Sequence, residues 1–181
     1  MRNAPTTPLT LSLLSLFCIV NSCKEHTPPS ANEAVIVLPS EAIGTLRPGM
    51  SLQAALKSIG PGFSPGPKTN WGDDGLFRQP WKSIRLGLEI DAVSETENGA
   101  QAIVSITATA PSRLDTARGI HVGSTRKQVE TAYAKEIEEG VETDSSPRDQ
   151  DMILISTEQG DMLFDFKKDS VARIFLGDSG D

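Results

Sequence analysis

Two segments of this chain, 74 residues apart, carry the same short pattern, and this repeat constrains the fold more than any other feature. In each segment an apolar residue precedes a glycine, and residues that favour the start of a helix follow. Gly49 and Gly123 occupy the equivalent positions, where glycine permits the positive φ of a turn. We therefore expect two copies of one structural unit.

Each of these glycines precedes a predicted helix with one apolar face. Ser51, and either Ser124 or Thr125, can cap the first backbone N–H groups, and Thr125 with Gln128 fits a capping box. The second helix is expected to run to Gly140. Apolar residues recur at helical spacing after both caps. They are Leu52, Ala55, Leu56 and Ile59 in the first copy, and Val129, Ala132, Tyr133 and Ile137 in the second.

Alternating apolar residues after each helix predict antiparallel strands. The pattern covers residues 84–90 and 102–108 in the first copy, and 152–155, 162–166 and 171–176 in the second. A unit of about 70 residues is marginally stable alone, so we expect the two sheets to join. The predicted fold class is α+β, with two tandem helix-plus-antiparallel-sheet units. The helices are expected on one face, and the other face is expected to stay open to solvent.

Two motifs resemble those of bacterial envelope lipoproteins. The stretch Ile43-Gly44-Thr45-Leu46-Arg47-Pro48-Gly49-Met50-Ser51 resembles their opening motif, and residues 119–125, followed by Val129 and Tyr133, resemble the second. The arrangement is similar to tandem domains of the β-lactamase-inhibitory-protein type, to the SmpA/OmlA (BamE) lipoproteins and to the RpoE-regulated lipoprotein family. The resemblance covers roughly residues 35–177 and implies a shared fold without a catalytic set.

The start of the chain has the layout of a lipoprotein signal. Cys23 follows an apolar stretch, residues 9–20, which is too short to span a bilayer, and a polar segment comes next. The quartet Val20-Asn21-Ser22-Cys23 resembles the lipobox, so we expect Cys23 to be lipidated; the alternative is ordinary secretion with a free thiol. The expected divisions are a signal peptide over 1–22, a flexible tether over 23–34, and repeats over 35–110 and 111–181.

Composition limits the partners and the location. The net charge of −7 disfavours nucleic acid, whose phosphates would repel the protein. Two histidines and two cysteines are too few for a soft-metal site, and no cofactor is expected. The expected partners are the membrane, through the lipid on Cys23, and an envelope protein. Lys24 follows Cys23 where enteric inner-membrane lipoproteins have aspartate, which favours the outer membrane, on its periplasmic or its surface face.

An aromatic segment rich in proline and glycine is the candidate binding site. Loops carry binding sites more often than frameworks do, and tryptophan is enriched at interface hot spots. The alternative is that these aromatics cover the seam between a helix and the sheet. The candidate residues are Phe63, Trp71, Asp73, Asp74, Phe77 and Trp81.

These observations predict a non-enzymatic, lipid-anchored envelope protein that binds another protein or supports envelope assembly. A second hypothesis is an inhibitor of a secreted or periplasmic enzyme, in which a hairpin loop and the open sheet face would cover an active site. In that case Asp73 or Asp74 would mimic a substrate carboxylate. An enzyme is the third class, and the sequence shows no catalytic constellation for it.

Replacing Cys23 tests the predicted anchor. Cys23→Ser should move the protein from the membrane fraction to the soluble fraction, because acyl chains contribute about 0.8 kcal/mol of membrane binding per buried methylene. Fractionation followed by immunoblotting measures the shift. Cys18→Ser, in the stretch that cleavage would remove, is the control. A Cys23→Ser protein that still pellets with membranes would refute the lipoprotein interpretation.

Overall fold

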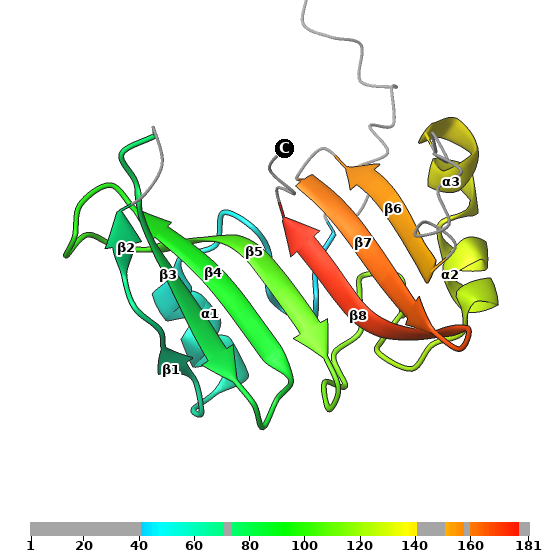
Figure 1. Ribbon diagram of the computed structural model, residues 1–181, viewed down its shortest axis with the longest axis horizontal. Helices are drawn as coiled ribbons and strands as arrows, with labels where there is room; N and C mark the ends of the chain where they lie inside the picture. The colour runs from blue at the N-terminus through cyan, green and yellow to red at the C-terminus, as the bar shows by residue number, and fades with distance from the viewer. Residues whose placement is uncertain (1–40, 71–73, 141–150, 158–159, 178–181) are drawn as a thin grey trace, which may run out of the picture. The chain divides into compact units, whose positions relative to one another are not determined.

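A computed structural model describes residues 41–70, 74–140, 151–157 and 160–177, and its main feature is one antiparallel sheet of eight strands (Figure 1). The strand order is β1-β3-β4-β5-β8-β7-β6, and β2 also pairs with β3. The strands are β1 Ser64–Pro65, β2 Thr69–Asn70, β3 Phe77–Ser83, β4 Leu88–Ser94, β5 Ala102–Thr109, β6 Met152–Thr157, β7 Gly160–Lys167 and β8 Ser170–Gly177. Three short helices accompany them, α1 Leu52–Ile59, α2 Arg126–Ala132 and α3 Ala134–Gly140.

The predicted fold class, two tandem α+β units, is wrong. The structure is a single large antiparallel sheet of eight strands with few and short helices, so it is more β-rich than two α+β units. The two parts of the sheet meet where β5 and β8 pair over five residues, Ser105–Thr109 with Gly177–Arg173. Extended structure also fills the stretch before β4. There β1, β2 and β3 stand where the sequence predicted a long connection.

The start of β4 also differs from the prediction. A strand was predicted over residues 84–90, but residues 84–87 form the turn between β3 and β4. Gly87 accounts for the turn, since it has a φ of +61° and donates its N–H to the carbonyl of Ile84. Pro80 is tolerated in β3 near the sheet edge, and its carbonyl accepts the N–H of Gly66 at 2.7 Å.

The sequence repeat is nevertheless visible in the backbone hydrogen bonds. The N–H of Gly49 donates to the carbonyl of Ile103, and the N–H of Gly123 donates to the carbonyl of Val171, both at 2.8 Å. Both glycines have positive φ, as predicted. The segment before each helix is therefore bonded to the start of the last strand of its own copy, β5 or β8.

Both helices start where the sequence predicts, but the second helix is not continuous as predicted. Ser51 caps α1, and Thr125 caps α2 with both bonds of the capping box in place. The expected continuous helix to Gly140 is interrupted at Tyr133, where φ is −119° and ψ is 23°, and α3 follows. Arg118 Nη1 donates to the carbonyl of Ala132 at 2.9 Å, which replaces a bond that a continuous helix would supply.

One buried core lies against a single face of the sheet. Core-facing residues on adjacent strands are paired in register across the whole sheet, and the first five of this row are at most 3% exposed. The row is Ile155, Met162, Leu176, Ile106, Ile90 and Trp81. Ala55 of α1 and Val129 of α2 belong to the same core cluster.

Substitution at Gly87 tests the β3–β4 turn. An added Cβ would lie 2.1 Å from the carbonyl oxygen of Thr109, so Gly87→Ala should lower the free energy of unfolding by about 3 kcal/mol or more. Gly119→Ala is the matched control, with a φ of +77° and no atom within 4 Å of the added Cβ. That control should cost only about 1–2 kcal/mol. Urea unfolding measures both values, and equal losses would contradict the close approach at Gly87.

Candidate binding face

The face of the sheet opposite the core, called the open face here, carries a mixed row of side chains. Residues alternate along β4, where Leu88, Ile90 and Ala92 are buried and Glu89 and Asp91 are half-buried. The row paired with Glu89 crosses the sheet from β3 to β6. Its members are Lys82, Glu89, Thr107, Phe175, Leu163 and Leu154.

The β6 side of this row is apolar and reaches solvent. Leu154 is 41% exposed, and Leu163 and Phe175 are half-buried. A solvated antiparallel face usually carries polar side chains. Three large apolar side chains on adjacent strands therefore mark this part of the open face as a candidate contact surface.

Charged side chains on and beside the open face form ion pairs. Lys82 Nζ lies 2.8 Å from Glu89 Oε1, and Arg173 pairs with Asp165 across β8 and β7. These pairs are partly exposed, so each contributes little to stability. Their main effect is to neutralise charge on this face.

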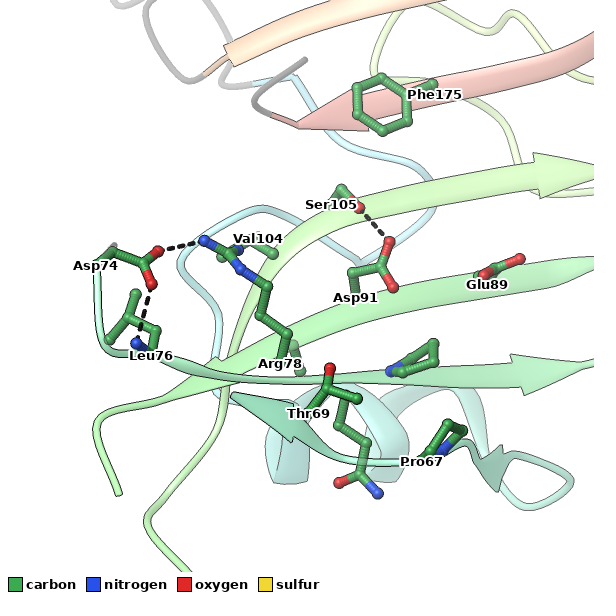
Figure 2. A pocket seen from close by; sticks show the side chains of 13 residues that line it. Pro67, Thr69, Asp74, Leu76, Arg78, Glu89, Asp91, Val104, Ser105 and Phe175 are labelled. Atoms are coloured by element: carbon green, nitrogen blue, oxygen red, sulfur yellow. Dashed lines mark hydrogen bonds and ion pairs between the residues drawn. The ribbon is translucent and has the colours of Figure 1, made fainter. Parts of the chain in front are cut away.

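A shallow hollow of about 900 Å³ lies over β3, β4 and β5 on the open face (Figure 2). Phe175 of β8 stands at one side, and Pro67 and Thr69 stand at the other. The lining combines apolar side chains with three carboxylates and one guanidinium. It consists of Pro67, Thr69, Asp74, Leu76, Arg78, Gln79, Pro80, Glu89, Asp91, Ala92, Val104, Ser105 and Phe175.

Two backbone features shape the hollow. A β-bulge shifts the register between β4 and β5, because Asp91 pairs with Ser105 whereas Ala92 pairs with Ile103. Gly177 lies opposite Ser105 on β8, where an added Cβ would come within 2.6 Å of the Ser105 Cβ. The two strands therefore approach each other too closely at this pair for any side chain at position 177.

Asp91 stands on the floor of the hollow. Its Oδ2 accepts the hydroxyl hydrogen of Ser105 at 2.9 Å (Figure 2). Among the residues that the structure describes, no basic side chain forms an ion pair with Asp91, although Lys82 attracts it electrostatically from a longer distance. Asp91 is therefore a half-buried carboxylate with one neutral donor.

Asp74 lies at the rim of the same hollow and is held in place. Its carboxylate accepts the backbone N–H of Leu76 at 2.9 Å and forms an ion pair with Arg78 (Figure 2). The backbone N–H of Leu76 and the guanidinium of Arg78 lower the pKa of Asp74. Asp74 is thus a charged residue whose charge is already matched.

The other predicted site residues lie elsewhere. Phe63 and Trp81 pack against the buried core, and Phe77 begins β3. Trp71, Asp73 and Cys23 lie outside the described residues. Of the candidate residues that the structure describes, Asp74 is the one that lines the hollow, and partner binding by the aromatic segment stays a prediction.

A second polar cluster is buried between the helices and the loop that precedes them. Tyr133 is fully buried, and its hydroxyl lies 3.2 Å from Glu41 Oε2 and 3.1 Å from Thr116 Oγ1. Arg118 lies over the Tyr133 ring, 4.6 Å from its centroid, and donates to Glu136 at 2.8 Å. Burial raises the pKa of the Glu41 carboxyl and of the Tyr133 hydroxyl. These satisfied bonds tie distant segments together, which indicates a structural role.

Sequence reasoning missed both the hollow and this cluster. Asp91, Ser105 and Phe175 meet only through strand register, and Glu41 and Tyr133 are 92 positions apart. The described residues contain no group of three or more histidine, cysteine, aspartate or glutamate side chains that could hold a metal ion. They also include no helix long and apolar enough to cross a membrane.

Glu136 provides a pH test of the buried cluster. Its hydrogen bonds from Arg118 lower its pKa below 4.5, so the carboxylate stabilises the folded state at neutral pH, and this contribution is lost as the pH falls through the folded pKa. Glu136→Gln should lower the free energy of unfolding by about 1–3 kcal/mol at pH 7 and by progressively less below pH 4.5.

Thermal unfolding at a series of pH values measures this difference. The control is Glu130→Gln, an exposed position on α2, which should change stability little at any pH. A Glu136→Gln deficit that stays constant down to pH 3.5 would show that the carboxylate charge is not its source.

Comparisons with known proteins give no relative. No protein-family model, no curated protein and no solved structure matches this chain. The open face and the signal pattern before Cys23 are therefore the features that bear on function.

Proposed function

We propose that this protein is a non-enzymatic, lipid-anchored protein of the cell envelope that binds another protein through the open face of its sheet. The observation that carries the proposal is the open face itself, where the exposed Leu154 and the half-buried Leu163 and Phe175 adjoin a hollow containing Asp91. The anchor rests on the signal pattern before Cys23.

The composition of the open face supports protein binding. Leu154, Leu163 and Phe175 supply apolar contact area next to charged pairs, the mixture found in interfaces that form and dissociate. The sheet beneath is fixed by main-chain hydrogen bonds, so a partner would meet a surface that is already ordered.

One observation supports the second candidate function, inhibition of a secreted or periplasmic enzyme. Ile84, in the turn between β3 and β4, is 92% exposed. The turn is fixed by Arg85, which donates to the carbonyl of Pro61 at 2.8 Å, and by the Thr109 N–H, which donates to Gly87. A rigid tip with an aliphatic side chain suits insertion into an apolar pocket of an enzyme.

Photo-crosslinking in intact cells tests the proposed face. A photoreactive amino acid in place of Thr107, at the middle of the open face, should give a covalent adduct with a protein partner. The same replacement at Gln53 of α1 or Lys127 of α2, both exposed, is the matched control and should give little adduct. Immunoblotting detects the adducts, and mass spectrometry identifies the captured protein.

The outcomes separate the two functions. Adducts from Gln53 or Lys127 without an adduct from Thr107 would overturn the assignment to the open face. A captured hydrolase whose activity falls when this protein is added would favour inhibition. A captured envelope protein without such an effect would favour the binding function.

A further inference from the structure

We propose that the partner presents a basic side chain, lysine or arginine, to Asp91 in the hollow, with apolar side chains beside it. This inference rests on the proposed function and names the chemistry of the partner segment. Its basis is a comparison of one cross-strand pair that has equivalent positions in the two copies of the repeat but different residues.

The backbone bonds define which residues are equivalent. Ile103 and Val171 correspond, because each accepts the N–H of the repeat glycine in its copy. Two residues further along, Ser105 corresponds to Arg173.

The register gives the facing residues. Ser105 pairs with Asp91, and Arg173 pairs with Asp165. A β-bulge follows both pairs, between Asp91 and Ala92 in one copy and between Asp165 and Phe166 in the other. The two aspartates therefore occupy the same structural position.

Their charges are matched differently. Arg173 forms an ion pair with Asp165 inside the second copy. In the first copy Ser105 stands where the arginine would be, and it gives Asp91 only a neutral hydroxyl donor. Within the described part of the chain no base forms an ion pair with Asp91, since Lys82 pairs with Glu89 and Arg78 pairs with Asp74, and Lys82 reaches Asp91 only through a longer-range electrostatic attraction. The first copy thus has a carboxylate without the guanidinium of its counterpart.

The surroundings of Asp91 suit a cation that enters from outside. Phe175, Val104 and Pro80 line the same hollow and can contact the aliphatic stem of a lysine or arginine. The ring of Phe175 can also accept a cation over its face. Asp91 is half-buried, so its attraction for a cation is screened less than that of an exposed carboxylate.

Other occupants fit less well. A calcium ion takes six to eight oxygen ligands, and the hollow offers Asp91 with one serine beside it, while Glu89 and Asp74 are already ion-paired. A phosphate or another carboxylate would meet repulsion from Asp91. A neutral apolar segment would leave the charge of Asp91 unmatched on burial.

Two peptide probes that differ only in charge test the inference. The probes are acetyl-Leu-Arg-Leu-amide and the same peptide with citrulline, a neutral arginine analogue, in the central position. Methyl NMR titration of the full-length protein in detergent follows Val104, which lines the hollow. The arginine peptide should bind about threefold to fivefold more tightly, as expected for one partly exposed ion pair.

Three variants test whether the charge of Asp91 causes the preference for the arginine peptide. Asp91→Asn keeps an acceptor for Ser105 and removes the charge, so the preference should disappear. Ser105→Arg places in the first copy the residue that the second copy has at position 173, and it should also abolish the preference. Glu130→Gln changes the net charge equally on α2 and should keep the preference.

The inference is overturned if the two peptides bind equally, if neither shifts the Val104 signals, or if Asp91→Asn keeps the preference. Failure here is distinguishable from failure of the proposed function. If the Thr107 position captures a partner in cells while the two peptides bind equally, the open face binds proteins, but the inference that the partner presents a basic side chain to Asp91 is wrong. If there is neither capture nor peptide preference, both proposals fail.

Discussion

The pairing of β5 with β8 is the interaction on which the rest of the structure depends. It joins the last strand of each copy, from the Ser105–Gly177 pair to the Thr109–Arg173 pair, and makes one sheet from five strands of the first copy and three of the second. It also continues the core across the centre of the sheet, because Ile106 faces Leu176 in the same row. Without this pairing each half would keep an open strand edge and too small a core.

The sequence predicts local features of this fold better than distant ones. The caps at Ser51 and Thr125 are confirmed, since a cap depends on residues within one turn of the helix. The break at Tyr133 depends on Arg118, which is far from Tyr133 in sequence and close only in the folded protein. The strand β3 is hidden by its proline and by the proline-rich and glycine-rich segment before it, which are typical of a loop. Periodicity also does not reveal which strands, β5 and β8, pair at the centre of the sheet.

The candidate site was predictable only in part. Asp74 is the predicted residue that lines the hollow, whereas Asp91 lies beyond the strand that was predicted over residues 84–90. The pairing of Asp91 with Ser105 depends on the bulge at that point, which has no clear sequence signal. Phe175 belongs to the other copy and reaches the hollow through the β5–β8 pairing. The side chains of the hollow are brought together by the pairing register of the strands, and they do not form a motif in the sequence.

The position of β8 has a consequence for the order of folding. Residues 170–177 follow every other strand in the sequence, yet β8 lies in the middle of the sheet, between β5 and β7. Contacts between residues so far apart in the chain form slowly, because the entropy of closing a long loop opposes them. The sheet can close only when this segment inserts, and until then the edge of β5 is available to other chains. The distant β5–β8 contact is therefore expected to form more slowly than the local β7–β8 hairpin, and the edge of β5 stays unpaired until it forms.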